Sequence, residues 1–212
     1  MAVSAFLFGK AFGNMLGGAA GANARQSDYL SDTIKRMLTT STYTPNRDTH
    51  ELKADVTNEV VGTGYTAGGA ALASKTITYT AADSWGTARA NTTAYVEGDV
   101  VRPATPNAHL YRCIIAGTSA AAPPTFPTVS GNTVADGTVT WAEIGSGITQ
   151  VDSADVSWPA STITARYAVD YNDTPTDKPL FNLTNFGADF SSNNGTFQVT
   201  NHALGIFVFS TP

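Results

Sequence analysis

The stretch 162-TITARYAVDY-171 decides the fold class of this chain. Its positions alternate between apolar or aromatic side chains and mostly polar ones: Ile163, Ala165, Tyr167, Val169 and Tyr171 on one side, and Thr162, Thr164, Arg166 and Asp170 on the other. A period of two is the signature of a β-strand, because successive side chains point to opposite faces of a sheet. We therefore expect a half-buried antiparallel strand here.

Other segments repeat this short-strand pattern, and turn residues separate them. They are 32–41, 56–61, 72–80, 197–199 and 205–210. The turn 192–195 directly precedes the segment 197–199. The run 205-GIFVFS-210 is continuously apolar, which predicts a strand covered on both faces. No window of 11 residues carries a helical apolar stripe. The pattern predicts an all-β fold, an antiparallel β-sandwich or a jelly-roll-like domain.

Composition excludes several classes of function. The 212 residues include 42% hydrophobic but only 14% charged side chains, and the net charge is −5. A basic patch is needed for non-specific nucleic-acid binding, and the sequence has no Lys/Arg run. No apolar run reaches the ~20 residues of a membrane span. Cys113 is the single cysteine, so we expect a buried apolar side chain there and neither a disulfide nor a cysteine zinc site.

The N-terminal segment 1–24 is rich in Gly and Ala and ends in a motif that mimics a signal-peptidase site. Its first nine residues carry no positive charge, and glycines interrupt its apolar run. We therefore expect a retained arm or edge strand. Phe6, Phe8 and Phe12 are the candidate anchoring residues through which such an arm would lie on a neighbouring subunit.

The composition of the sequence changes between residues 81 and 147: this segment has its own aromatic residues and its own turn residues. When this segment is removed, 76-TITY-79 leads into the strand pattern that begins at Val151, which would make a hairpin. This is typical of a domain inserted at a hairpin tip. The predicted organisation is an outer β domain formed by residues 1–80 and 148–212, with a small β module at 81–147.

The outer segments resemble a family of small virion-associated proteins of tailed bacteriophages, with capsid decoration and head-fibre proteins as the nearest type. The resemblance rests on seven stretches in the same order: SDTIK at 31–35, STYTPNRDTH at 41–50, GTGYTAGG at 62–69, DVSWP at 155–159, TARYAV at 164–169, DTP at 173–175 and FGAD at 186–189. It implies a particle component on or outside the capsid rather than a catalyst.

The inserted segment contains Tyr95, GDVV at 98–101, YRC at 111–113, GTS at 117–119, Pro124 and DGTVTW at 136–141. In this pattern it is similar to phage fibre and decoration modules and, in its first half, to small chitin-binding-type carbohydrate modules. Sugar binding needs exposed aromatic faces, and the candidate contacts are Trp85, Tyr95, Tyr111 and Trp141. The polar partners would be Asp99, His109 or Arg112. The alternative is that these aromatics form the core of a module of about 65 residues, since so small a domain has few other large side chains.

Catalytic and metal-binding motifs are weak. The three histidines are isolated in sequence, and no nucleophile elbow is present. The glycine-rich loop 62–69 lacks the Lys-Ser/Thr of a phosphate-binding loop and is interpreted as a turn. Clustered oxygens at 170–173 and Asp177 allow a calcium site, but an Asx-rich turn explains them equally well. We expect no enzymatic activity, no cofactor and no structural metal.

The resemblance thus implies a virion structural protein that attaches to the assembled shell, with the major capsid protein as its first partner and tail proteins as the alternative. We also expect a homo-oligomer, and no contact with nucleic acid or membrane. The competing hypothesis is a tail or baseplate adhesin whose inserted module binds a host surface glycan. An enzyme that degrades polysaccharide is a further alternative, which the lack of a paired acid and base disfavours.

Overall fold

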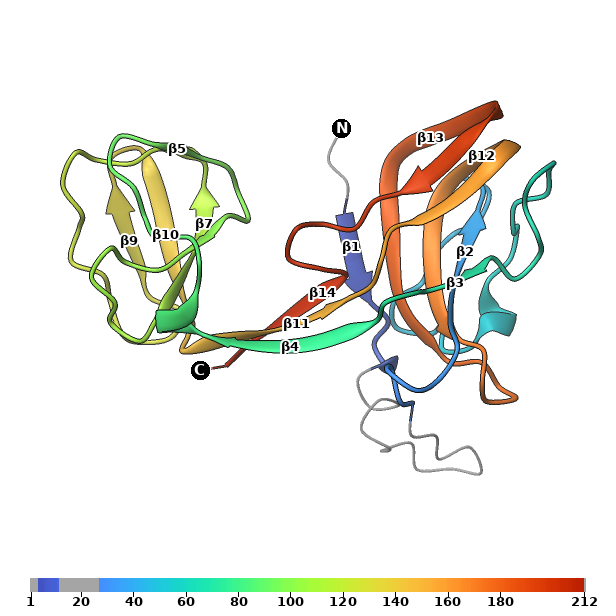
Figure 1. Cartoon of the computed structure of the whole chain (residues 1–212), viewed down its shortest axis with the longest axis horizontal. Coiled ribbons are helices and arrows are strands. Elements are labelled where there is room, and N and C mark those ends of the chain that lie inside the picture. Colours follow the sequence, from blue (N-terminus) through green and yellow to red (C-terminus); the bar gives the residue numbers. More distant parts are fainter. Residues whose placement is uncertain (1–3, 12–26, 212) are drawn as a thin grey trace. The chain divides into compact units, whose positions relative to one another are not determined.

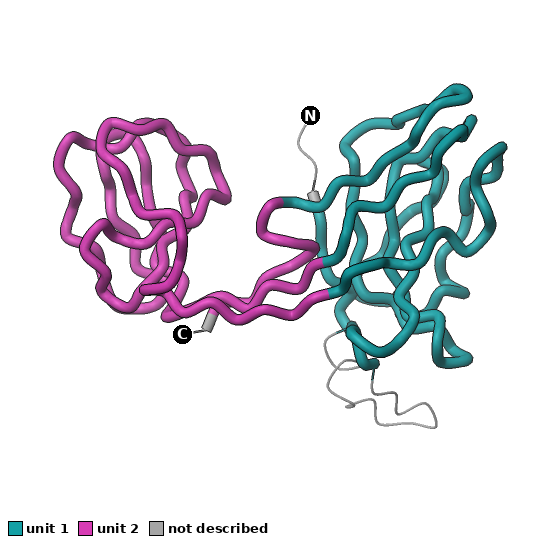
Figure 2. The backbone as a smooth tube through the Cα atoms, viewed as in Figure 1, with its two compact units in different colours: residues 1–75, 153–202 teal, residues 76–152, 203–212 magenta. Residues whose placement is uncertain are grey.

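The structure is a computed structural model that describes residues 4–11 and 27–211. The predicted fold class is confirmed, because the chain is all-β and its antiparallel sheets place it in a β-sandwich-like class. It divides into two compact units, which Figure 2 colours separately. Unit 1 is Met1–Lys75 with Ser153–His202, and unit 2 is Thr76–Asp152 with Ala203–Pro212. No helix among the described residues is long and apolar enough to cross a membrane.

Unit 1 is built on a five-stranded antiparallel sheet with the order β1-β13-β12-β2-β3. Its strands are β1 (Ser4–Leu7), β2 (Ile34–Thr39), β3 (Ala70–Ala71), β12 (Val156–Asn172) and β13 (Leu180–Val199). A short 3-10 helix, Lys53–Asp55, lies in the connection from β2 to β3. The alternating stretch 162–171 falls in β12, at the centre of the sheet between β13 and β2 (Figure 1).

The alternation in β12 holds for its first half and fails in its second. Thr162 and Thr164 are exposed while Ile163 and Ala165 are buried, as a half-buried strand requires. From Ala168 onward both faces are covered, so that Asp170, predicted on the polar face, is 1% exposed. Pairing with β2 on one side and β13 on the other places this half of the strand in the middle of the unit.

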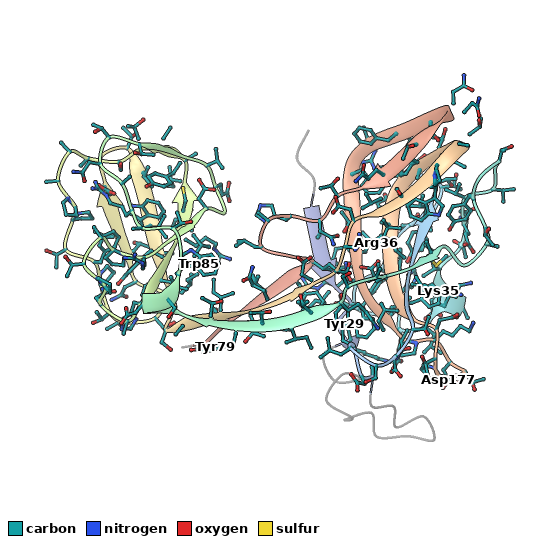
Figure 3. The ribbon with its side chains drawn as sticks, in the orientation of Figure 1. Tyr29, Lys35, Arg36, Tyr79, Trp85 and Asp177 are labelled. Carbon is teal, nitrogen blue, oxygen red and sulfur yellow. The ribbon has the colours of Figure 1, made fainter. Side chains whose placement is uncertain are left out.

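Asp170 is tolerated inside the unit because Arg36 of β2 pairs with it. Arg36 Nε and Nη2 donate to the two carboxylate oxygens of Asp170 at 2.7 Å each. The remaining nitrogen, Nη1, donates to Asn201 Oδ1 at 2.8 Å. Figure 3 labels Arg36 in unit 1. A buried charge is acceptable only when its partner and its hydrogen bonds are complete, and this arrangement supplies both.

The β12–β13 hairpin is long and bends back on itself, as Figure 1 shows at the end of β13. Phe186 and Phe197 belong to the same strand, yet their ring centroids are 6.2 Å apart. An unbent strand would hold them about 35 Å apart. The bend falls where the pairing register shifts around Ser161 and where Ala160 and Asn194 take positive φ angles of 49° and 48°. The predicted turn at 192–195 is therefore an irregular corner inside β13.

Unit 2 contains two further sheets and a two-stranded ribbon. The first sheet has the order β14-β11-β4, from β4 (Thr76–Ala81), β11 (Gly147–Asp152) and β14 (Phe207–Thr211). The second has the order β6-β7-β10-β9, from β6 (Val100–Val101), β7 (Leu110–Ile115), β9 (Thr133–Asp136) and β10 (Val139–Gly145). β5 (Ala94–Tyr95) pairs with β8 (Gly117–Thr118), and a 3-10 helix covers Ala82–Ser84.

The strands that flank the inserted segment pair with each other, with Thr76 opposite Asp152 and Ala81 opposite Gly147. The units divide differently from the sequence-based boundaries, because the flanking strands and the C-terminal strand belong to unit 2. The cause is the pairing of β14 with β11, which ties 207–211 to the insert rather than to the outer domain. The expectation that 205–210 is covered on both faces is wrong, since Val208 is 38% exposed.

Candidate functional site

Three of the four aromatic residues that were candidate sugar contacts are core residues of unit 2. Tyr95, Tyr111 and Trp141 are 8%, 0% and 0% exposed. The rings of Tyr95 and Trp141 meet edge to face, with centroids 4.9 Å apart. The rest of this cluster is Val101, Cys113 and Val139. Because stacking on a sugar needs an open ring face, these residues match the alternative interpretation, in which the aromatics build the core of a small module.

Trp85, the fourth candidate, is only partly buried, but its ring and its indole N–H are both engaged. The N–H donates to the carbonyl oxygen of Val100 at 3.0 Å. The ring packs against a cluster that joins Ala82 and Ile148 to Val100 and Leu110. Trp85 thereby connects the β4–β11 end of unit 2 to its second sheet (Figure 3).

Beneath these aromatics lies a buried polar network centred on Asp136. Arg89 donates to both of its carboxylate oxygens, at 2.9 and 2.7 Å. Trp141 Nε1 donates to the same carboxylate at 2.9 Å, as does the amide of Ala120. Burial alone would raise the pKa of Asp136, but the hydrogen bonds from Arg89, Trp141 and Ala120 outweigh it and lower the pKa. The Trp141 indole is thus committed to holding the module together.

Three polar residues, Asp99, His109 and Arg112, were expected to contact a sugar together with the aromatic residues. Asp99 and His109 instead have partners within the unit, and Arg112 is exposed. Asp99 accepts a hydrogen bond from the amide of Val96 at 2.9 Å, which closes a turn. His109 Nδ1 lies 2.7 Å from Oε1 of Glu143, a buried carboxylate that also accepts from the amide of Gly145. Arg112 is exposed on β7. These three groups do not converge with the buried rings into a binding site.

The candidate anchoring arm is part of the core of unit 1 where the structure describes it. Residues 4–7 form β1, which pairs with 182–185 of β13. Phe8 is 1% exposed and belongs to the core, and Phe6 packs against the same cluster. Phe12 lies outside the described residues. Phe6 and Phe8 therefore stabilise the unit to which they belong instead of offering free side chains to a neighbour.

The acidic turn at 170–177 is held by cations of the chain itself. Asp173 lies 2.7 Å from Lys35 Nζ and 2.5 Å from Lys178 Nζ. Burial would raise the pKa of Asp173, but these two lysines outweigh it and lower the pKa. Asp170 is satisfied by Arg36. Within residues 4–11 and 27–211, no group of three or more His, Cys, Asp or Glu side chains is placed to hold a metal ion.

A groove that the sequence did not indicate lies in the inner angle of the bent strand β13. Its volume is about 450 Å³, within the usual range for small-molecule sites. One limb of the bend contributes Thr184, Phe186, Phe190 and Ser191, and the other contributes Thr196, Phe197, Gln198, Val199 and Thr200. The groove belongs entirely to unit 1.

A series of neighbouring aromatic rings in unit 1 leads into this groove. The ring centroids of neighbours are 5.8 to 6.2 Å apart along the series Tyr65, Trp158, Phe197, Phe186 and Phe190. Phe197 and Phe186 are 6% and 9% exposed and form the floor, whereas Phe190 at the end of the series is 53% exposed. The series thus ends in an open phenyl face supported by packed rings.

None of the nine described residues that line the groove is ionisable, and five carry a hydroxyl or an amide. Two of these polar side chains are oriented by neighbours. Ser191 Oγ lies 2.7 Å from the hydroxyl of Thr164, and Gln198 Nε2 donates to Asp155 at 3.2 Å. The groove therefore combines apolar ring faces with neutral donors and acceptors, which suits binding of an uncharged polar ligand and offers no group for acid–base chemistry.

The sequence contains little that would have indicated this groove. Phe190 lies between polar residues in 189-DFSS-192, and this local pattern predicts only an exposed side chain. Phe186 and Phe197 appear as inward residues of separate strands. Only the bend at 192–195 brings the three rings together, and the run Asn193-Asn194-Gly195 was the one local signal that a corner was required.

Unit 2 has a smaller hollow of about 220 Å³, lined by Pro103, Ala104, Thr105, Asn107, Pro123, Pro124 and Phe126. Phe126 covers the buried Tyr111 ring at a centroid distance of 4.4 Å.

Comparison of the chain with protein-family models, with curated proteins and with solved structures found no match. The functional interpretation therefore depends on the residues and their geometry.

Proposed function

We propose that this chain is a non-enzymatic structural protein of a tailed-bacteriophage particle, a capsid decoration, cement or head-fibre component that attaches to the assembled shell. The observation that carries the proposal is that all seven stretches of the family resemblance fall within unit 1. They come from both halves of the chain, on either side of the insert. The resemblance thus covers one folded body rather than scattered segments.

The resembling stretches also contact one another. Ser41 donates to Asp189 at 3.0 Å, which joins the stretch 41–50 to 186–189. A Cβ added to Gly62 would lie 2.4 Å from the carbonyl oxygen of Thr162, and the Tyr65 ring lies beside Trp158. Gly62 is therefore needed for close packing against β12, because a larger residue would collide with that strand. This gives the first glycine of the stretch 62–69 a structural role.

In this proposal the protein works by adhesion. Unit 1 binds the shell, and the inserted segment, which enters and leaves through the paired strands β4 and β11, is displayed from it. A repeating lattice presents many equivalent sites, so weak single contacts add up to firm attachment when the protein is oligomeric. The low content of charged residues, 14% of the chain, suits contacts that become buried, because unpaired charge is costly there.

The experiment is a binding assay with purified full-length protein and phage particles that lack it. Empty capsids and isolated tails are incubated separately with the protein and are then recovered by sedimentation. Saturable binding to capsids in a fixed ratio to shell subunits is expected, with little binding to tails. Binding to tails alone would favour the tail or baseplate adhesin, and binding to neither would refute attachment to the particle.

The alternative in which the inserted module binds a host polysaccharide receives no support from its four candidate aromatics. Three are buried and Trp85 is engaged in packing. A sugar-binding role for this protein therefore has to be sought elsewhere in the chain.

A further inference from the structure

We propose that the groove in the inner angle of β13 is a binding site for a neutral saccharide. This inference goes beyond attachment to the shell and does not depend on it. It rests on three observations: an open phenyl ring on a packed aromatic floor, a rim of uncharged hydroxyl and amide groups, and a volume that suits one or two sugar rings.

The aromatic part of the groove matches the apolar side of a sugar. Phe190 is 53% exposed, although a phenyl ring gains from burial, and its neighbour Phe186 supports it edge to face at 6.2 Å. The face of an aromatic ring carries negative charge and attracts the polarised C–H groups on one side of a pyranose. A sugar stacked on Phe190 would cover this exposed ring without requiring any charged partner.

The rim of the groove matches the hydroxyl groups of a sugar. Thr184, Ser191, Thr196, Gln198 and Thr200 supply neutral donors and acceptors around the rings. Because none of the lining residues that the structure describes is basic, a ligand bearing carboxylate, sulfate or phosphate would lose its hydration without gaining an ion pair. This excludes acidic polysaccharides and nucleic acid as the ligand class and selects neutral sugars.

An added β-strand from another protein is a weaker match to the same edge. Within the described residues, β1 pairs with β13 at 182–185 and leaves the following edge without a partner strand. This edge is irregular, however. Gly187 has φ +80° and its amide donates to the side chain of Asn185, while the amide of Asn194 donates to Thr162. Such irregularities interrupt the regular row of backbone groups that strand addition needs.

The test uses the full-length protein on an array of neutral oligosaccharides built from glucose, galactose, mannose, rhamnose and N-acetylglucosamine. The same array carries uronic-acid and sulfated oligosaccharides, and a second array carries apolar peptides. We expect binding to at least one neutral sugar, confirmed by calorimetry. Phe190→Ala should weaken that binding by about tenfold or more, whereas Phe190→Trp should retain it.

Two further variants separate the binding role from a folding defect. Thr184→Val with Thr200→Val keeps the side-chain shape, removes two rim hydroxyls and should weaken binding several-fold, by roughly the cost of two lost hydrogen bonds. Val129→Ala removes an exposed apolar side chain of unit 2 and should leave binding unchanged. Circular dichroism is measured for every variant.

Several outcomes would overturn the inference. They are the absence of binding to every neutral sugar, preference for the acidic sugars, or sugar binding that Phe190→Ala leaves intact. Binding to apolar peptides that depends on Phe190, without sugar binding, would reassign the groove to a protein partner. Because no phage particle enters this assay, its failure leaves the shell-attachment proposal standing, and failure of capsid binding leaves the saccharide site standing.

Discussion

One aromatic group in each unit can be compared: a compact cluster in unit 2 and a chain of neighbouring rings in unit 1. In unit 2, Tyr95, Tyr111 and Trp141 gather in one cluster and are at most 8% exposed. In unit 1, a series of five rings runs from Tyr65 to Phe190 and ends in a ring that is 53% exposed. The unit 2 cluster is therefore closed, whereas the unit 1 series extends from buried rings to the surface.

The two units also differ in the residues that form their hydrophobic cores. Unit 2 has short strands, several of two residues, and its second sheet depends on a few large rings and a buried Arg–Asp network. Small domains bury a smaller fraction of their surface, so each large side chain counts for more. Unit 1 has a separate core of Phe8, Met37, Val169, Leu180 and Leu183. Phe190 is not a member of this core cluster.

The largest effect is expected when the core of unit 2 is opened by Trp141→Ala. The change removes a ring that is 0% exposed and a hydrogen bond to Asp136, and it should cost about 5 kcal/mol of unfolding free energy. Cys113 reports on this unit, because it is buried in the same cluster and burial raises the pKa of its thiol. Its labelling by a thiol reagent should accelerate strongly in the variant. Slow labelling in a folded Trp141→Ala protein would mean that the ring is not a core element.

The matching test in unit 1 breaks its buried ion pair with Arg36→Met. Asp170 is then left as an unpaired buried charge, so unit 1 should lose about 3–4 kcal/mol. The expected readout is faster hydrogen exchange of amides in β2 and β12, with Cys113 labelling unchanged. Adding Asp170→Leu should recover most of the loss, because the orphaned charge is removed. Equal exchange in both units would show that the two do not unfold independently.

A smaller effect is expected from acid, and it should distinguish the units. The folded state lowers the pKa of Asp136 in unit 2 and of Asp173 in unit 1. A lowered folded pKa favours folding above the unfolded value of about 4 and loses this contribution as the pH falls through the folded pKa. Asp136→Asn leaves the buried Arg89 guanidinium without its ion pair, so it should destabilise unit 2 at every pH. The acid dependence of the remaining stability of unit 2 should flatten, and that of unit 1 should stay intact. Urea midpoints measured between pH 2 and pH 6 from resolved amide signals of each unit test this, and an unchanged profile for unit 2 would contradict it.

The smallest effect is expected from Phe190→Ala. Because the ring is 53% exposed and stands at the end of its series, its loss should change the unfolding free energy by less than about 1 kcal/mol. Phe197→Ala is the control, since that ring is 6% exposed and lies in the floor of the groove. It should cost several times more, at about 3 kcal/mol. A comparable loss in both variants, measured by thermal unfolding, would show that Phe190 is a structural residue.

Much of the local structure could be predicted from the sequence, because a strand pattern depends on residues that are close together along the chain. The alternation around Ile163 and Val169 predicted β12, and the strand patterns at 76–79 and after 151 predicted a pair that is present between β4 and β11. The position of the insert could be inferred approximately for the same reason. Its C-terminal partner could not be inferred, because the pairing of β14 with β11 joins residues more than fifty positions apart.

What the sequence determined by itself is the class of structure: short alternating runs, frequent turn residues and few charges specify an all-β chain with a segment of different texture inside it. What only the tertiary structure decided is the environment of each side chain. Tyr111 and Phe190 both stand in strand-like sequence, yet one is buried by its own sheet and the other is exposed at a bend. Burial depends on contacts between distant segments, and no local pattern of residues encodes those contacts.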